Sequence, residues 1–297
     1  MNPLVEYPRT ADLAYWIMER ESIRHRREAG LPAPWTSDPD MANVRYCNVH
    51  REDDKVTKWI RANPVYSGPS VPVWRVVLAR MLNRIESLEL VQGAVAANDL
   101  ETVKLRLKVA RQTNRIWGNA YTISTCGKSM DKVDYVIDWV VRAVKDDWLG
   151  PTPSTGFKYT CQEYFNWLTS VDGLGSFLAA QVVADLKNMP GHPLSSAPDK
   201  ESFVTHGPGS LKGVAAYFGT PCTPGSFKGL LALIAQQVTF LLPAYVGPIH
   251  MQDLQNCMCE FSKYIRVREG GRARNTYPPT NRIQKDTKYG DDDDSCD

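Results

Sequence analysis

The stretch that decides the fold is Leu168-Thr-Ser-Val-Asp-Gly-Leu-Gly-Ser-Phe-Leu-Ala-Ala-Gln-Val-Val-Ala-Asp-Leu186. Its pattern predicts a helix, a tight turn at Gly173 and Gly175, and a second helix. Two glycines with one apolar residue between them let the backbone turn sharply and expose consecutive N–H groups. Those groups lie at the start of the second helix, where the helix dipole favours an anion. We expect Leu174 to anchor the turn in the core.

This stretch resembles the helix-hairpin-helix of the DNA glycosylase superfamily, which grips one DNA strand through its backbone. The resemblance implies that Gly173, Gly175 and Ser176 contact DNA phosphates. The apolar residues from Phe177 to Val183 are expected to bury the second helix. An ordinary helix–turn–helix stays open as the alternative, because glycine is common after helices.

Composition limits the class of protein. The chain has 297 residues and 43% hydrophobic content, which is ample for a core. Its net charge is only +2, so any nucleic-acid surface must be a local patch. Seven scattered cysteines without a signal peptide indicate reduced thiols in a cytosolic protein. The lone Cys257-Met-Cys259 pair argues against zinc, and no apolar run reaches membrane-spanning length.

Hydrophobic periodicity predicts an all-α protein with little sheet. The expected helices, besides those of the hairpin, are residues 10–29, 72–89, 100–110, 131–146, 226–242 and 250–267. Residues 1–267 are expected to form a single glycosylase-like domain of two closely packed helical lobes. The tail, residues 268–297, is first basic and then acidic, and its end is expected to be mobile.

The helix over residues 250–267 carries a polar stripe. Asp253, Asn256, Glu260 and Lys263 fall at offsets of three, four and three, so they share one helix face, and Glu260 can pair with Lys263. The stripe is either a solvent-facing surface with ordinary ion pairs or the wall of a site. In a site, a carboxylate could activate an amine and a cation could stabilise a leaving pyrophosphate.

Two further motifs concern phosphate. Gly207-Pro-Gly209, followed by Ser210, makes a rigid loop that exposes its backbone, and it suits either a phosphate or a structural turn. The stretch Thr122–Ser129 ends in Gly-Lys-Ser like a Walker A motif, but Thr122 stands where glycine is required. A P-loop kinase is therefore not expected. The five histidines show no metalloprotease or zinc-deaminase spacing.

Three blocks together resemble one family. They are Arg45–Trp59, Gly207–Gly213 and Asp253–Tyr264, with a looser fourth block at residues 119–135. The pattern is similar to the phage thymine-hypermodification proteins called alpha-glutamyl/putrescinyl thymine pyrophosphorylases or amino acid:DNA transferases. It is also similar to the helical domain of the 5-hydroxymethyluracil DNA kinases. The resemblance spans about residues 10–280.

The resemblance implies a transferase that acts on double-stranded phage DNA in the cytoplasm of an infected bacterium. A partner kinase first places a pyrophosphate on the 5-hydroxymethyl group of uracil. The transferase then replaces it with the amine of an amino acid or polyamine and releases pyrophosphate. To enclose the reactive methylene in a pocket, such a transferase would be expected to flip the nucleotide out of the duplex. No cofactor is predicted, apart from a monovalent cation that the hairpin could hold.

Site residues are assigned on this basis. Asp253, Glu260 and Lys263 are the expected catalytic residues. The expected substrate and pyrophosphate ligands are Asn48, Arg51, Gly207, Gly209, Ser210, Asn256, Tyr264 and Arg266. The family has an acidic residue before the Lys-Tyr pair where this chain has Ser262, so Glu260 or Asp253 would have to be the base.

Two other functions stay open. A DNA glycosylase or DNA-binding protein of the same fold would need a catalytic Asp or Lys soon after the hairpin, where Asp185 and Lys187 lie. We expect Asp185 to be an ordinary helix residue. The other alternative is a non-catalytic accessory protein of the modification system.

Overall fold

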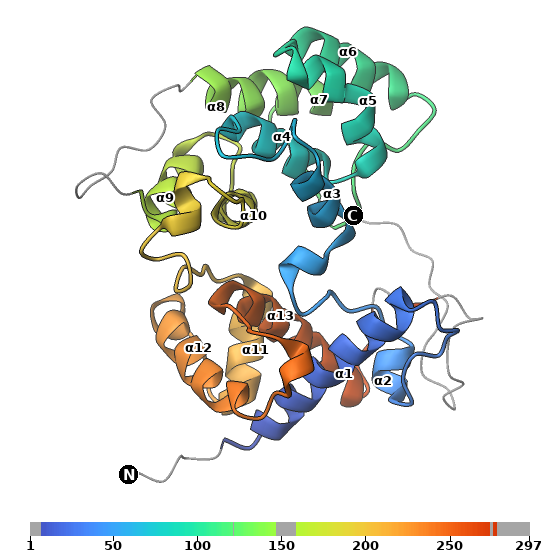
Figure 1. Cartoon of the computed structure of the whole chain (residues 1–297), viewed down its shortest axis with the longest axis vertical. Helices are drawn as coiled ribbons and strands as arrows, with labels where there is room; N and C mark the ends of the chain where they lie inside the picture. The colour runs from blue at the N-terminus through green and yellow to red at the C-terminus, as the bar shows by residue number, and fades with distance from the viewer. Residues whose placement is uncertain (1–6, 121, 147–158, 274–275, 278–297) are drawn as a thin grey trace. The chain divides into compact units, whose positions relative to one another are not determined.

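The computed structural model describes residues 7–120, 122–146, 159–273 and 276–277 (Figure 1). This part of the chain is helical, and its β pairing is limited to an isolated bridge between Val44 and Thr276. The predicted all-α class is therefore confirmed. The basic-then-acidic end of the tail, residues 278–297, lies outside the described residues. None of the described helices combines the length and apolar character needed to cross a bilayer.

The chain divides into two compact units, each with its own core. The first unit contains residues 1–51 and 204–297, and the second contains residues 52–203. The hairpin belongs to the second unit. The stripe, the Gly-Pro-Gly loop and the block that begins at Arg45 belong to the first, apart from the end of that block beyond Arg51.

The first unit is built from both ends of the sequence. Its helices are α1 (Thr10–Glu28), α2 (Pro39–Ala42), α11 (Pro208–Phe218), α12 (Pro224–Thr239) and α13 (Met251–Arg268), with a 3-10 turn at Ala244–Val246. Helix α1 packs against α12 and α13, as Figure 1 shows. The core includes the fully buried side chains of Trp16, Ile17, Ile234 and Phe261. This packing fixes α1 and α13 relative to each other within the first unit.

Two glycines let α11 lie close against α13. A Cβ atom on Gly213 would fall far inside van der Waals contact with the carbonyl oxygen of Met258. A Cβ atom on Gly209 would overlap Sγ of Cys259. The spacing of four residues places both glycines on one face of α11. Close helix packing therefore accounts for much of the glycine pattern in this block.

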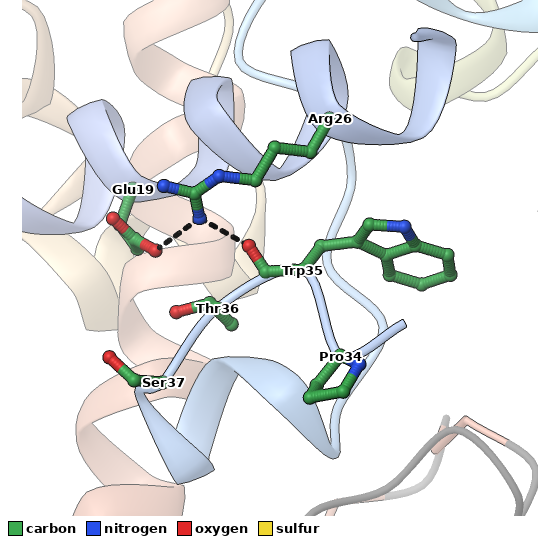
Figure 2. Close-up of a pocket in the computed structure, with 6 residues that line it drawn as sticks. All are labelled: Glu19, Arg26, Pro34, Trp35, Thr36 and Ser37. Atoms are coloured by element: carbon green, nitrogen blue, oxygen red, sulfur yellow. Dashed lines mark hydrogen bonds and ion pairs between the residues drawn. The ribbon is translucent and has the colours of Figure 1, made fainter. Parts of the chain in front are cut away.

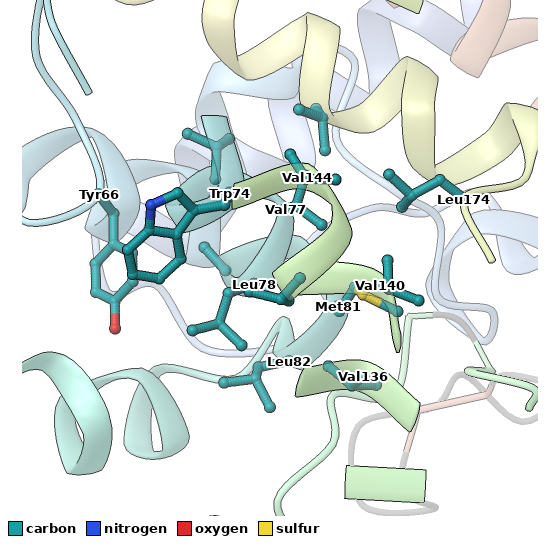
Figure 3. Close-up of a cluster of buried hydrophobic side chains, with 14 of the residues drawn as sticks. Tyr66, Trp74, Val77, Leu78, Met81, Leu82, Val136, Val140, Val144 and Leu174 are labelled. Atoms are coloured by element: carbon teal, nitrogen blue, oxygen red, sulfur yellow. The ribbon is translucent and has the colours of Figure 1, made fainter. Parts of the chain in front are cut away.

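The second unit contains the remaining helices. They are α3 (Lys55–Ala62), α4 (Val73–Leu82), α5 (Ile85–Ala96), α6 (Leu100–Ala110), α7 (Lys132–Asp134), α8 (Arg142–Asp146), α9 (Cys161–Ser170) and α10 (Ser176–Lys187). A π-helical stretch, Tyr135–Val141, joins α7 to α8, and 3-10 turns lie at Arg51–Asp53 and Pro193–Ser196. Figure 3 shows part of the core, in which Val77 and Met81 of α4 lie among Val140, Val144 and Leu174.

The hairpin forms as predicted, but its two glycines differ. Gly173 has a φ of 96°, and a Cβ atom there would lie 2.5 Å from Tyr135 Oη. Glycine is therefore required at position 173 by conformation and by space. Gly175 is the N-cap of α10 with an ordinary φ of −69° and open space around it. Leu174, which is 2% exposed, anchors the turn as expected.

Two expectations about helices were wrong in detail. The helix expected over residues 72–89 is two helices, because Asn83 adopts a left-handed conformation (φ 44°) that ends α4. Phe177 was expected to bury α10, yet its side chain is 53% exposed. The buried face of α10 is formed by Ala179, Val182 and Val183, and Phe177 lies off this face.

The close contact between α11 and α13 gives a stability test. Gly213→Ala should lower the free energy of unfolding by about 2 kcal/mol, because the methyl group has only the rigid backbone of Met258 to displace. The matched control is Gly229→Ala on the exposed side of α12, where nothing lies within 4 Å of the new Cβ. That change should raise the free energy of unfolding by up to about 1 kcal/mol. Urea unfolding of the two variants measures both effects, and equal shifts would contradict the packing role of Gly213.

Candidate functional site

The polar stripe of α13 faces the backbone of residues 45–51, an irregular segment that ends at the 3-10 turn of Arg51–Asp53 and that we call the clasped segment. Each of the four stripe side chains bonds to one backbone group of the clasped segment. Asp253 Oδ1 accepts from Arg51 N–H (2.9 Å), Asn256 Nδ2 donates to the Asn48 carbonyl (3.2 Å), Glu260 Oε2 accepts from Cys47 N–H (3.0 Å), and Lys263 Nζ donates to the Arg45 carbonyl (2.9 Å). The stripe is thus neither purely solvent-facing nor an open wall.

The register of these bonds follows from helix geometry. Going along α13 from Asp253 to Lys263, the bonded residues of the clasped segment go back from Arg51 to Arg45. The segment therefore runs antiparallel to α13. A helix rises 1.5 Å per residue, which places Asp253 and Lys263 roughly 15 Å apart along the axis. Six residue steps of extended chain can span this distance. Because the clasped segment lies in no sheet, its polar groups need such side-chain partners when they are buried.

Arg20 of α1 holds the clasped segment as well. Its Nε donates to the carbonyl oxygens of Tyr46 (3.3 Å) and Cys47 (2.9 Å), and its Nη2 donates to Oδ1 of Asn48 (2.5 Å). The arginine is only 3% exposed. Arg20 was not among the predicted site residues, although its position on the apolar face of α1 indicates in the sequence that it is buried. A charged residue on a buried face must find partners inside the protein.

His50 and Asp253 form a charged pair at one end of the clasped segment. His50 Nε2 lies 2.6 Å from the Val246 carbonyl oxygen, and Nδ1 lies 3.8 Å from Asp253 Oδ2. Both neighbours are acceptors, so the protonated imidazole, with two N–H groups, suits this place best. The hydrogen bond to Asp253 raises the pKa of His50 despite burial. His50 was not among the predicted site residues.

The same pair keeps Asp253 ionised. Burial raises the pKa of Asp253, but the hydrogen bonds from His50 and from the Arg51 backbone outweigh burial, so the pKa is lowered. A carboxylate with a lowered pKa is a weak general base near neutral pH. Of the two candidate bases, Asp253 is therefore the less suitable.

Glu260 and Lys263 pair as predicted, with 2.7 Å between Oε2 and Nζ. Glu260 is 8% exposed, and the Lys263 ammonium also lies 4.8 Å from the ring centroid of Tyr46. This ammonium thus contacts a carboxylate, an aromatic face and the Arg45 carbonyl at once. The contacts fix its position at the edge of the clasped segment.

The other predicted ligands have varied surroundings. The loop expected at Gly207-Pro-Gly209 is instead the start of α11: Gly207 is the N-cap, and its N–H donates to Oγ of the buried Ser210 (2.9 Å). Gly209 packs against Cys259. Tyr264 is 2% exposed and donates from Oη to Asp38 Oδ2 (3.2 Å). Arg266 is exposed and lies roughly a quarter turn away from the stripe.

A surface cavity of about 530 Å³ lies elsewhere in the first unit. It is lined by Glu19, Arg26, Pro34, Trp35, Thr36 and Ser37. Figure 2 shows the Arg26 guanidinium between the Glu19 carboxylate (3.3 Å) and the Trp35 carbonyl oxygen. None of the predicted site residues lines this cavity.

The hairpin presents a different surface. Gly175, Ser176 and Phe177, at the N-terminus of α10, are all exposed. Lys128, from the sequence that resembles a Walker A motif, pairs instead with Asp172 of the hairpin turn (3.0 Å). Its ammonium also lies 3.9 Å from the ring centroid of Trp139. Lys128 is thus part of the hairpin surface.

The two residues that a glycosylase would need after the hairpin are buried and bonded. Asp185 is a helix residue, as expected, and forms an ion pair with Arg80 of α4. Lys187 is 2% exposed and donates to the Lys200 carbonyl (2.9 Å). Among the described residues, no cluster of three or more His, Cys, Asp or Glu side chains could hold a metal ion.

The pair of His50 and Asp253 makes stability depend on pH. Because the pKa of His50 is raised, its contribution is complete below the ordinary value of 6.5 and is lost as pH rises through the folded-state pKa. His50→Gln should therefore destabilise the protein below pH 6.5, and the difference from wild type should shrink as pH rises through the folded-state pKa of His50. The same substitution at the exposed His206 is the control for replacing a histidine.

NMR titration of the His50 ring checks the cause directly. Asp253→Asn should lower the pKa of His50, because the carboxylate that accepts its hydrogen bond is gone. An unchanged His50 titration in this variant would show that Asp253 does not stabilise the imidazolium.

Comparison with known proteins relates the chain to one family. The family model described as "5-hmdU DNA kinase, helical domain" matches residues 8–272, which includes the clasped segment, α11, α13 and the hairpin. No curated protein and no solved structure shows significant similarity to the chain. A match over most of the sequence places the chain in one family: it belongs to the helical domains of the 5-hmdU DNA kinase type.

Proposed function

We propose that the protein is an amine:DNA transferase of a phage thymine-hypermodification system. It replaces the pyrophosphate of 5-pyrophosphoryloxymethyluracil in DNA with an amino acid or polyamine. One observation carries this proposal: the chain has the helical domain of the kinase family, yet its Gly-Lys-Ser sequence departs from a Walker A motif. Because Lys128 of this sequence pairs with Asp172, phosphoryl transfer from a nucleotide is not favoured.

The cationic groups around the clasped segment can stabilise a departing pyrophosphate. In the reaction, the amine nitrogen forms a bond to the methylene carbon, the carbon–oxygen bond breaks, and the oxygen leaves with the electron pair. Cationic groups near that oxygen stabilise the charge that develops. Arg51, Lys263 and the imidazolium of His50 are the candidates, because all three are held at the clasped segment.

The incoming amine must lose a proton to act as a nucleophile. Glu260 is our candidate base, because the lowered pKa of Asp253 makes that carboxylate a weak proton acceptor. Glu260 Oε2 already accepts from Cys47 N–H and pairs with Lys263. Its carboxylate is therefore fixed in place, and proton transfer would use its remaining lone pairs.

The DNA strand would be held by the hairpin. Exposed N–H groups at the start of a helix bind phosphates without reading sequence. The exposed side chain of Phe177 beside them could stack on an unpaired base, which would help to keep the target nucleotide flipped.

A glycosylase function is less well supported. Asp185 is buried in its ion pair with Arg80, and Lys187 is buried and bonded to the Lys200 carbonyl. Neither side chain can approach a nucleotide without breaking these contacts. A non-catalytic accessory protein is the remaining alternative, and the assay below separates it from a transferase.

The test is a nucleoside assay. Duplex DNA that contains 5-pyrophosphoryloxymethyluracil is incubated with the protein and a panel of amines, then digested and analysed by mass spectrometry. We expect a new nucleoside with at least one amine, together with release of pyrophosphate. If no amine gives a product while an established transferase works on the same DNA, the protein is not a transferase.

Lys263 gives a sharper test of the site. Lys263→Ala should reduce transfer at least about 100-fold, because both the leaving-group cation and a bond to the clasped segment are lost. Lys263→Arg keeps the charge and should retain part of the activity. Lys212→Ala, on the exposed side of α11, is the control and should remain fully active. Normal activity of Lys263→Ala would remove the stripe from the mechanism.

The hairpin is tested by DNA binding. Gly175→Val places a branched side chain beside the exposed N–H groups and should weaken binding about equally for all DNA sequences. Gly93→Val, at an exposed and open position of α5 in the same unit, controls for the cost of valine in a helix. Fluorescence anisotropy with several duplexes measures the effect. A loss limited to some sequences would argue against contact with the backbone alone.

A further inference from the structure

We propose that Arg27 and Arg45 contact the sugar–phosphate backbone of DNA from the first unit, beside the clasped segment. The inference rests on the proposed function and extends it to a DNA contact other than the hairpin. It starts from two arginines that lie over the aromatic rings of Trp35 and Tyr277. We call these four residues the arginine–aromatic surface.

The two rings of this surface contact each other and are held by backbone groups. Their centroids are 5.6 Å apart in an edge-to-face arrangement. Trp35 Nε1 donates to the Leu31 carbonyl (2.7 Å), and the Tyr277 N–H donates to the Asn43 carbonyl (3.0 Å). The rings therefore form a fixed base for the arginines.

Each ring carries one guanidinium. Cζ of Arg27 lies 5.1 Å from the ring centroid of Trp35, and Cζ of Arg45 lies 5.4 Å from that of Tyr277. Attraction to the π face of a ring requires no hydrogen bond, so the N–H donors of the guanidinium stay available for another acceptor. The rings thus position two charges without neutralising them.

The charges of Arg27 and Arg45 have no carboxylate partner in the part of the chain that the structure describes. Both side chains are exposed, and neither guanidinium forms a hydrogen bond or an ion pair there. Arg26, the neighbour of Arg27 on α1, differs because it pairs with Glu19 (3.3 Å). Figure 2 shows the Trp35 ring turned away from that pair. The uncompensated charge on this surface therefore belongs to Arg27 and Arg45.

This arrangement fits a nucleic-acid strand better than a single small anion. Two aromatic rings separate the two guanidinium groups, so the arginines do not converge on one point. A DNA strand offers a phosphate at every nucleotide, and arginine binds phosphate through paired N–H donors. Contacts of this kind hold the duplex without reading its sequence.

The arginine–aromatic surface adjoins the candidate site. Arg45 is the first residue of the clasped segment, and its carbonyl accepts from Lys263 Nζ (2.9 Å). A strand held by Arg27 and Arg45 would therefore pass beside Lys263, a proposed cation for the departing pyrophosphate. Only side chains make this contact, so the backbone of the clasped segment stays accessible to the modified nucleotide.

The experiment measures how salt changes binding to a short unmodified duplex. Fluorescence anisotropy gives the dissociation constant of the full-length protein between about 50 and 200 mM salt. Arg27→Gln and Arg45→Gln should each weaken binding about tenfold at the middle of this range and lower the slope of log K against log[salt] by about 1. Lys228→Gln removes an exposed cation of α12 that has no ion pair among the described residues, so it is the matched control and should keep the wild-type slope.

Lysine variants separate the contact from an effect on folding. Arg27→Lys and Arg45→Lys keep the charge, so the slope should stay near that of the wild type. Because both arginines are exposed, the thermal midpoints of the glutamine variants should also stay close to the wild-type value.

Three results would overturn the proposal. The first is a wild-type slope in both glutamine variants. The second is an equal loss in Lys228→Gln, because binding would then follow total charge and not this surface. The third is weaker binding of inorganic pyrophosphate by Arg45→Gln with an unchanged DNA slope, which would assign this arginine to the leaving group.

Binding to unmodified DNA needs no chemistry, so its outcome can be separated from that of the transferase proposal. Lower slopes for both glutamine variants of a protein that gives no new nucleoside would reject the transferase and keep the DNA contact. An active transferase whose variants keep the wild-type slope would reject the DNA contact alone. A wild-type protein that does not bind the duplex overturns the DNA contact.

Discussion

Most of the backbone of residues 45–51 lies outside any sheet or helix, so its polar groups need side-chain partners, and the rest of the candidate site depends on how it finds them. Side chains of α13 bond to it along one line, and Arg20 of α1 bonds to its central residues. These bonds need α13 to be fixed, and the glycines of α11 contribute by letting the two helices approach closely. Because the clasped segment is bonded to both α1 and α13, its position follows the positions of these two helices.

This arrangement gives the polar residues of α13 a structural role, since Asp253 and Glu260 each accept a backbone N–H of the clasped segment. Any chemical task must use the lone pairs and charges that remain. His50 and Arg51 then become as important as the stripe, because they belong to the segment that the stripe holds in place. In the proposed function, an anionic pyrophosphate would meet the cationic groups of this segment.

Much of the fold could be predicted because its signals are local. The 3.6-residue period marked α1, α6 and α13, and the stripe spacing correctly paired Glu260 with Lys263. The exposure of Phe177 could not be predicted, since an apolar residue on the first turn of a helix can face either way. The partners of the stripe could not be predicted either. They lie more than 200 residues away along the chain, and only the tertiary fold brings Cys47, His50 and Arg51 to the stripe.

Hydrogen–deuterium exchange tests most directly the claim that the clasped segment is the site and the hairpin the DNA grip. Exchange would be followed for the free protein, with unmodified duplex DNA, and with DNA that carries 5-pyrophosphoryloxymethyluracil. The hairpin amides at residues 175–178 should be protected by both DNAs. The amides of residues 45–51 should gain further protection only with the modified DNA. If the modified base leaves residues 45–51 unchanged and protects another part of the chain, the site lies elsewhere and the proposed role of the stripe is wrong.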